Sequence, residues 1–130
     1  PDARLKGSAP YEQGLLFGMD AASGFAVAQL APMPSDRVLD LCCAPGAKLA
    51  LIADHMQHRG QLVGVDAAPA RLQVCASLCK KYRVARPRAA AAPGEWECLV
   101  VRDDGVRFDG PWTAPEVVWC SASDAALFED

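Results

Sequence analysis

The sequence lacks the features that mark several classes of protein. It contains no run of about 18 uncharged apolar residues, which a membrane-spanning helix requires. It does not open with a charged stretch followed by an apolar one, the pattern of a secretory signal. It also lacks an excess of positive charge, since its net charge is −3, whereas domains that bind nucleic acid by charge alone are usually basic. We therefore expect no membrane partner, and any nucleic-acid contacts must come from a local basic patch or from another domain.

The cysteines do not form a zinc or disulfide pattern. No C-x-x-C pair occurs, and an apolar content of 52% is sufficient to build a core without cross-links. We expect free thiols in a reducing, intracellular compartment and no metal. His55 and His58 could share a metal with a cysteine, but their position in the last turn of a predicted helix is typical of residues that complement the helix dipole. The six cysteines are Cys42, Cys43, Cys75, Cys79, Cys98 and Cys120.

The length of 130 residues suits one domain. The chain begins at Pro1 and stops after Asp130 without a closing element, so we expect a piece of a longer protein. Glycines and prolines predict an irregular segment over 1–19, and the pattern changes again in a tail over 110–130. We expect the folded core to be 20–109.

Helical and strand patterns alternate along the core. Such alternation predicts an α/β, doubly wound, Rossmann-like sheet of parallel strands with right-handed crossovers and helices on both faces. The predicted elements are a helix over 22–31, a strand over 38–42, a helix over 48–59, a strand over 61–65, a helix over 69–83, a surface loop over 84–95, a strand over 98–101 and a further strand over 115–120.

The turn in VLDLCCAPGAK, residues 38–48, joins a predicted buried strand to a helix. Its small side chains permit close backbone approach, and the free N–H groups at the helix start favour a negative group. Asp66 ends the next strand, 20 residues after Gly46, a spacing that suits a carboxylate accepting hydrogen bonds from ribose hydroxyls. Together these features predict an adenosine-type cofactor; a plain connection with no ligand is the alternative.

The motifs for other nucleotides are absent. A dinucleotide fingerprint requires G-x-G-x-x-G, and a P-loop requires Ser or Thr after its lysine, whereas Lys48 is followed by Leu49. A single glycine with a carboxylate on the second strand fits a ligand without a pyrophosphate, such as S-adenosylmethionine. Another nucleotide-binding α/β domain remains an alternative.

The same residues resemble a known family. DLCCAPGAK is similar to the D-x-C-A-A-P-G-G-K signature of the Nop/Sun family of RNA cytosine-5 methyltransferases, and GLLFGMDAAS (14–23), VGVDAAPARL (63–72) and the pair Asp104-Gly105 extend the likeness over about 11–109. The resemblance implies a class I methyltransferase fold, S-adenosylmethionine as cofactor with S-adenosylhomocysteine as product, and tRNA or rRNA as partner, bound mainly by regions outside this segment.

The resemblance also implies roles for individual residues. Asp66 would hold the ribose hydroxyls, Arg71 would lie beside the cofactor pocket or simply be a solvated helix residue, and Asp104, in preference to Asp103, would meet the adenine edge. The residues that would wrap the methionine end are Cys42, Cys43, Ala44, Pro45, Gly46, Ala47 and Lys48.

The catalytic group is missing from this pattern. Methylation of cytosine C5 requires a thiolate that adds to C6, and the resemblance implies one cysteine after a proline and one after a threonine. No cysteine here has either neighbour. Cys120 is the candidate substitute, although a cysteine after a tryptophan is more often a core residue. The sequence therefore represents either the cofactor half of an enzyme or an inactive homologue with a binding or assembly role.

Three residues depart from the family pattern. Ala47 replaces a glycine, Leu49 a hydroxyl residue and Met19 a glutamine, so cofactor affinity is expected to be lower than in relatives. A basic run around Tyr82, comprising Lys80, Lys81, Arg83, Arg86 and Arg88, either contacts RNA phosphates or forms a solvated helix end.

Overall fold

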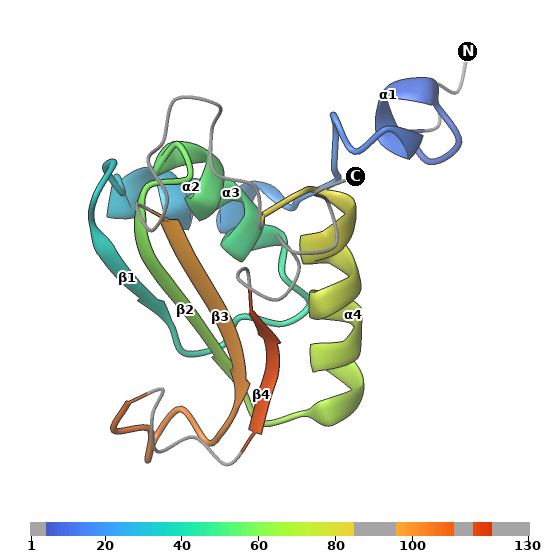
Figure 1. Ribbon diagram of the computed structural model, residues 1–130. Coiled ribbons are helices and arrows are strands. Elements are labelled where there is room, and N and C mark those ends of the chain that lie inside the picture. The colour runs from blue at the N-terminus through green and yellow to red at the C-terminus, as the bar shows by residue number, and fades with distance from the viewer. Residues whose placement is uncertain (1–4, 85–95, 111–115, 121–130) are drawn as a thin grey trace.

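The computed structural model describes residues 5–84, 96–110 and, as backbone, 116–120. Helices and strands alternate as the sequence predicted (Figure 1). The predicted loop over 84–95 lies outside the described residues except for Val84, as does most of the predicted tail. The elements are α1 (Ala9–Glu12), α2 (Ala21–Leu30), β1 (Arg37–Asp40), α3 (Ala47–His55), β2 (Gly60–Asp66), α4 (Pro69–Lys81), β3 (Trp96–Arg102) and β4 (Glu116–Cys120).

Local chemistry sets the ends of the helices. The Asp20 carboxylate accepts a hydrogen bond from the Ser23 N–H at 2.9 Å and caps α2, and Pro69 begins α4, where a missing N–H costs nothing. Helix α3 ends at His55, four residues before the predicted end, because Gln57 and His58 adopt left-handed backbone angles.

The sheet has the order β1-β2-β3-β4. Strands β1, β2 and β3 are parallel, with Val38 opposite Leu62 and Leu62 opposite Cys98. The sequence predicted a further strand over 115–120 without an orientation, and in the structure β4 pairs antiparallel with β3 (Figure 1). A parallel neighbour requires a crossover that usually contains a helix, and residues 103–110 form only turns and irregular backbone.

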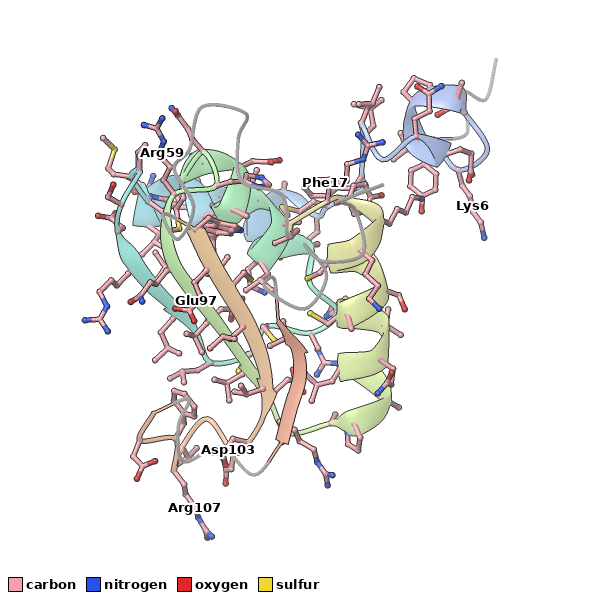
Figure 2. All side chains as sticks on the ribbon, in the orientation of Figure 1. Lys6, Phe17, Arg59, Glu97, Asp103 and Arg107 are labelled. Carbon is pink, nitrogen blue, oxygen red and sulfur yellow. The ribbon has the colours of Figure 1, made fainter. Side chains whose placement is uncertain are left out.

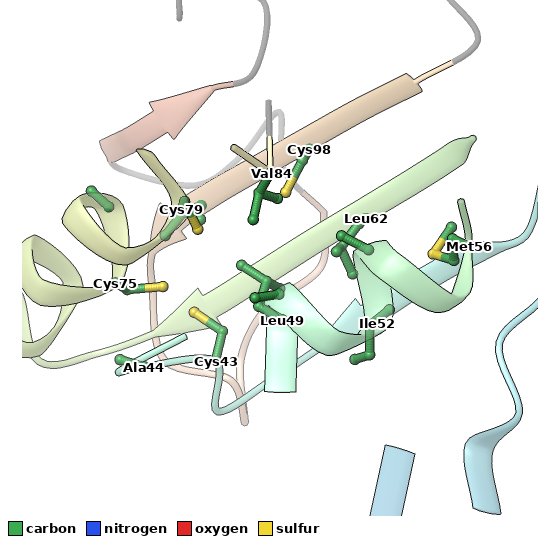
Figure 3. Packing of buried hydrophobic residues seen from close by; sticks show 14 of the residues in the cluster. Cys43, Ala44, Leu49, Ile52, Met56, Leu62, Cys75, Cys79, Val84 and Cys98 are labelled. Carbon is green, nitrogen blue, oxygen red and sulfur yellow. The ribbon is translucent and has the colours of Figure 1, made fainter. Parts of the chain in front are cut away.

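One core lies between the sheet and its helices. Leu62 of β2 and Cys98 of β3 point to the same side and pack in one cluster with Leu49 of α3 and Cys75 of α4 (Figure 3). Helices α3 and α4 therefore cover the same face, because both crossovers step in the same direction across the sheet. The sequence predicted helices on both faces; the two described crossover helices, α3 and α4, lie on one.

The opposite face of the sheet is partly open. It carries Leu39, Val63 and Leu99, with Leu39 49% exposed, and Gln61 donates a hydrogen bond to Glu97 at 3.0 Å on this side (Figure 2). A shallow hollow of about 270 Å³ lies over these residues.

The N-terminal segment packs against the end of α4. The rings of Phe17 and Tyr82 pack edge to face with their centres 5.1 Å apart. The Lys81 ammonium lies 3.7 Å from the centre of the Tyr11 ring. Within this segment, predicted to be irregular, the short helix α1 forms. In the described part of the chain, no helix has the length and apolar character needed to span a bilayer.

Two leucines on neighbouring strands test which face of the sheet is the core. Leu62 is fully buried under α3 and Leu39 is half exposed on the other face. We expect Leu62→Ala to lower the free energy of unfolding by about 2–5 kcal/mol, because it leaves a cavity. Leu39→Ala, the matched control, is expected to lower it by about 1 kcal/mol or less. Urea denaturation of both variants measures the difference, and equal losses would contradict the assignment.

Candidate functional site

A cleft lies at the edge of the sheet where the parallel strands end. Its volume is about 420 Å³, within the range of small-molecule sites. Ligands of open α/β sheets bind at this edge because the loops after the strands meet there. The residues that line the cleft are Leu41, Cys42, Asp66, Ala67, Arg71, Asp104, Gly105 and Val106.

The turn after β1 forms one wall and is held by backbone hydrogen bonds. The Cys42 N–H donates to the Asp40 carboxylate and the Cys43 N–H donates to the Val65 carbonyl, both at 3.0 Å. Gly46 then adopts a φ of 110°, and a Cβ atom at this position would lie 3.0 Å from Cys75 Sγ. Glycine is therefore required here both by the backbone angle and by the approach of α4.

The helix after this turn begins without a side-chain cap. Gly46 is the N-cap of α3, so no side chain accepts a hydrogen bond from the first N–H groups of the helix. These donors and the positive end of the helix dipole favour a negative group.

Asp66 ends β2 and is only 6% exposed. Its Oδ2 accepts a hydrogen bond from the Ala44 N–H at 3.3 Å, and its Oδ1 accepts one from the Ala68 N–H at 3.0 Å. Arg71 Nη1 lies 3.7 Å from Oδ2. Because a carboxylate oxygen accepts more than one hydrogen bond, Asp66 keeps acceptor capacity toward the cleft that it lines.

Asp104 lines the cleft from the loop after β3. Its Oδ1 accepts a hydrogen bond from the Val106 N–H at 3.0 Å, and Arg107 Nε lies 3.9 Å from Oδ2. Figure 2 shows Asp103 and Arg107 in this loop, beyond the ends of the strands. Asp104 lines the cleft, whereas Asp103 accepts a hydrogen bond from the Asp104 N–H at 2.7 Å. Gly105 lets the loop approach β1, since a Cβ there would lie 2.8 Å from the Leu41 carbonyl oxygen.

A group of thiols lies behind the turn. Cys43, Cys75 and Cys79 are buried, and Figure 3 shows the sulfur atoms of Cys43 and Cys75 pointing toward each other. Hydrogen bonding to Cys75, followed by burial, raises the pKa of both Cys43 and Cys79, whereas the same hydrogen bonds lower the pKa of Cys75. All three sulfur-bearing side chains are buried, so none of them is accessible as a nucleophile to a substrate in the cleft.

The structure gathers part of the predicted site. Cys42, Asp66, Arg71 and Asp104 line one cleft. Cys43 and Ala44 are buried behind it, and Pro45 is exposed. Lys48 lines a separate hollow with Asp40, Leu41 and residues of α2. Gly46 and Ala47 are not among the lining residues of the cleft, but they form the start of α3.

Four lining residues were not predicted as site residues, namely Leu41, Ala67, Gly105 and Val106, although Gly105 was noted as the neighbour of Asp104. Leu41 and Ala67 are the neighbours of Cys42 and Asp66, so their position at the strand ends was a usable signal. Val106, which is almost fully exposed, carries no pattern in the sequence that marks it. The side chain of Cys120 lies outside the described residues; its backbone pairs with Leu99. In the described ranges, no cluster of three or more His, Cys, Asp or Glu residues is arranged to hold a metal ion.

A family model described as 16S rRNA methyltransferase RsmB/F matches residues 27–95, more than half of the chain. The chain belongs to this family. The match confirms the resemblance to Nop/Sun methyltransferases and spans the turn, Asp66 and Arg71.

Named relatives agree with this assignment. The 26S rRNA (cytosine-C(5))-methyltransferase nsun-1 of Caenorhabditis elegans is 34% identical over 96 residues, covering 72% of this chain and 14% of the relative. Ribosomal RNA small subunit methyltransferase B of Enterobacter sp. (strain 638) is 30% identical over 128 residues, covering 91% of this chain and 29% of the relative. The chain thus spans less than a third of the length of either relative.

Solved structures confirm the fold class. The crystal structure of NSun6 from Pyrococcus horikoshii with SFG, an S-adenosylmethionine analogue, superposes with a TM-score of 0.63 and 21% identity, covering 75% of this chain and 23% of that one. The α/β, Rossmann-like methyltransferase fold predicted from the sequence is therefore present here as part of a larger fold.

Substitution of Gly46 tests the contact between the turn and α4. We expect Gly46→Ala to lower the free energy of unfolding by about 1–3 kcal/mol, because alanine is strained at this φ and meets Cys75 Sγ. In a Cys75→Ala background, which removes that sulfur, the same substitution is expected to cost less. Thermal or urea denaturation of the four proteins measures the coupling. An identical cost in both backgrounds would contradict the contact.

Asp40 provides a test by pH. Burial raises the pKa of its carboxyl above the ordinary value of 3.8, against the opposing effects of the Cys42 N–H and Lys48. Within the described residues its Oδ2 has no hydrogen-bond partner. The folded protein therefore holds this proton more tightly than the unfolded chain, so the contribution of Asp40 to stability falls as pH rises from 3.8 through the folded-state pKa.

Asp40→Asn removes this titration and keeps an acceptor for the Cys42 N–H. We expect the unfolding free energy of the wild type, minus that of the variant, to decrease over this pH window in urea denaturation. A difference that rises with pH, or does not change, would show that the carboxyl is not destabilised by burial.

Proposed function

We propose that this chain is the S-adenosylmethionine-binding part of an RNA cytosine-5 methyltransferase that acts on rRNA or tRNA. The observation that carries the proposal is the cleft at the carboxyl edge, which brings Cys42, Asp66 and Asp104 together in a member of the RsmB/F family. We assign the cofactor-binding core to 20–109, preceded by the N-terminal segment 1–19 and followed by the tail 110–130.

The cleft fits the proposed cofactor in size and in chemistry. Its lining is apolar at Leu41 and Val106 and acidic at Asp66 and Asp104. Two carboxylates suit the hydroxyls of a ribose and the amino group of an adenine, because ionised carboxylates are acceptors only. When bound, the cofactor supplies a methyl group on a sulfonium, an electrophile that needs no metal.

Each part of the site has a proposed role. The uncapped start of α3 and the turn at 42–47 take the methionine end, with the helix N–H groups facing its carboxylate. Asp66 receives the ribose hydroxyls and Asp104 the adenine edge. Lys48 lines the separate hollow beside Asp40, so we assign it no contact in the cleft.

The thiolate that adds to cytosine C6 is proposed to lie outside the described residues. Cys43, Cys75 and Cys79 are buried, and none of the six cysteines follows a proline or a threonine. RNA contacts are proposed to lie mainly on other parts of the protein as well, because the net charge of this chain is −3. An RNA substrate implies an intracellular location.

Calorimetry on the chain tests the proposal. We expect heat of binding with S-adenosylhomocysteine and none with NAD. Asp104→Ala is expected to weaken S-adenosylhomocysteine binding by about tenfold, the effect of losing one charge-assisted hydrogen bond. Asp103→Ala is the matched control and is expected to change affinity less, because its side chain bonds the backbone and does not line the cleft.

Three outcomes would contradict parts of this proposal. Heat with NAD alone would overturn the methyltransferase cofactor, and heat with neither ligand would favour an inactive homologue that uses the fold as a scaffold. A larger loss with Asp103→Ala than with Asp104→Ala would reverse the assignment of the adenine contact.

A further inference from the structure

Both backbone groups of one buried turn residue are held by a pair of charged side chains. Ala44 is 3% exposed. Its N–H donates to Asp66 Oδ2, and its carbonyl oxygen accepts a hydrogen bond from Arg71 Nη2. Arg71 Nη1 also faces Asp66 Oδ2 at 3.7 Å, so the three residues form a closed ring of contacts.

This ring joins two consecutive β-α units. Ala44 belongs to the turn between β1 and α3, whereas Asp66 ends β2 and Arg71 is the third residue of α4. The next residue, Pro45, has no N–H and is exposed. The hydrogen bonds of Ala44 are therefore the last ones that fix the backbone of the turn before Gly46. Without Arg71, the buried Ala44 carbonyl would lose the hydrogen bond that it makes to this side chain.

The two contacts of Arg71 depend on the shape of its guanidinium group more than on its positive charge. The Arg71 side chain is 58% exposed, and an ion pair with so exposed a cation contributes little by itself. The planar fork of arginine reaches two acceptors in fixed directions, here a carbonyl and a carboxylate, whereas the ammonium of lysine acts as a single point charge.

We infer that Arg71 is a positioning residue: it holds the Ala44 backbone and the Asp66 carboxylate in fixed relation, and so shapes the cleft without being required to touch the ligand. The effect on ligand binding rests on the proposed function, but the effect on the turn does not. The ring exists in the ligand-free chain and can be measured there.

Amide hydrogen exchange followed by NMR tests the ring in the ligand-free protein. Arg71→Ala is expected to accelerate exchange of the Ala44 amide by about tenfold or more, because the turn opens more often. Arg71→Lys is expected to accelerate it less, and this variant serves the same test if the alanine variant does not fold. Arg37→Ala, which removes an exposed guanidinium on β1, is the charge-matched control and should leave the Ala44 amide unchanged.

Core amides such as that of Val100 report global stability and should exchange at wild-type rates in every variant. Wild-type exchange at Ala44 in Arg71→Ala would overturn the inference. So would wild-type exchange in Arg71→Lys, because charge alone would then suffice. Equal acceleration at Ala44 and Val100 would also overturn it, since Arg71 would then stabilise the whole fold.

Ligand binding separates positioning from direct contact. A positioning role predicts that Arg71→Ala weakens S-adenosylhomocysteine and adenosine by the same factor, because the shape of the cleft and Asp66 serve both. Direct contact with the amino-acid part predicts weaker binding of S-adenosylhomocysteine and unchanged binding of adenosine, and this result would overturn the inference. If neither ligand binds the wild type, the proposed function fails while the exchange measurement still decides the role of Arg71.

Discussion

The carboxylate of Asp66 is the constraint on which the site depends. Asp66 is the last residue of β2 and is almost inaccessible to solvent. Its carboxylate accepts hydrogen bonds from the Ala44 N–H, in the turn after β1, and from the Ala68 N–H, just before α4. A buried carboxylate is tolerated only when its acceptors are satisfied, so the turn at Ala44 and the start of α4 must close around it. The wall of the cleft follows from that requirement, and the same side chain then presents its remaining acceptor capacity to the cavity.

The parallel core could be predicted because its signals are local. Short apolar runs bounded by turns predicted β1 to β3 within a few residues, and the starts of α2 and α4 were predicted to within one residue. The antiparallel pairing of β4 and the coverage of one sheet face were not predicted, because they depend on how a connection returns to the sheet and on the direction of each crossover. Alternation along the chain carries neither kind of information.

The residues of the site also fall into those that the sequence predicted and those that it did not. Asp66 was predicted because a carboxylate at the end of a parallel strand lies at the ligand edge, whereas Asp104 was implied by the family resemblance. The position of Lys48 on the far side of the turn was not predicted, since the direction of a side chain in the first turn of α3 depends on the left-handed Gly46 before it. The hydrogen bonds of the Ala44 backbone to Asp66 and Arg71 could not be predicted either, because Arg71 is 27 residues away in the chain.

The approach of Gly46 to Cys75 couples two positions that sequence comparison would treat as unrelated. A thiol is small enough to lie beside the turn, whereas a leucine or phenylalanine at residue 75 would push the glycine outward. Replacements at these two sites should consequently covary across homologues. A protein engineer who wished to reshape the turn for a bulkier cofactor analogue would have to redesign the inner face of α4 at the same time.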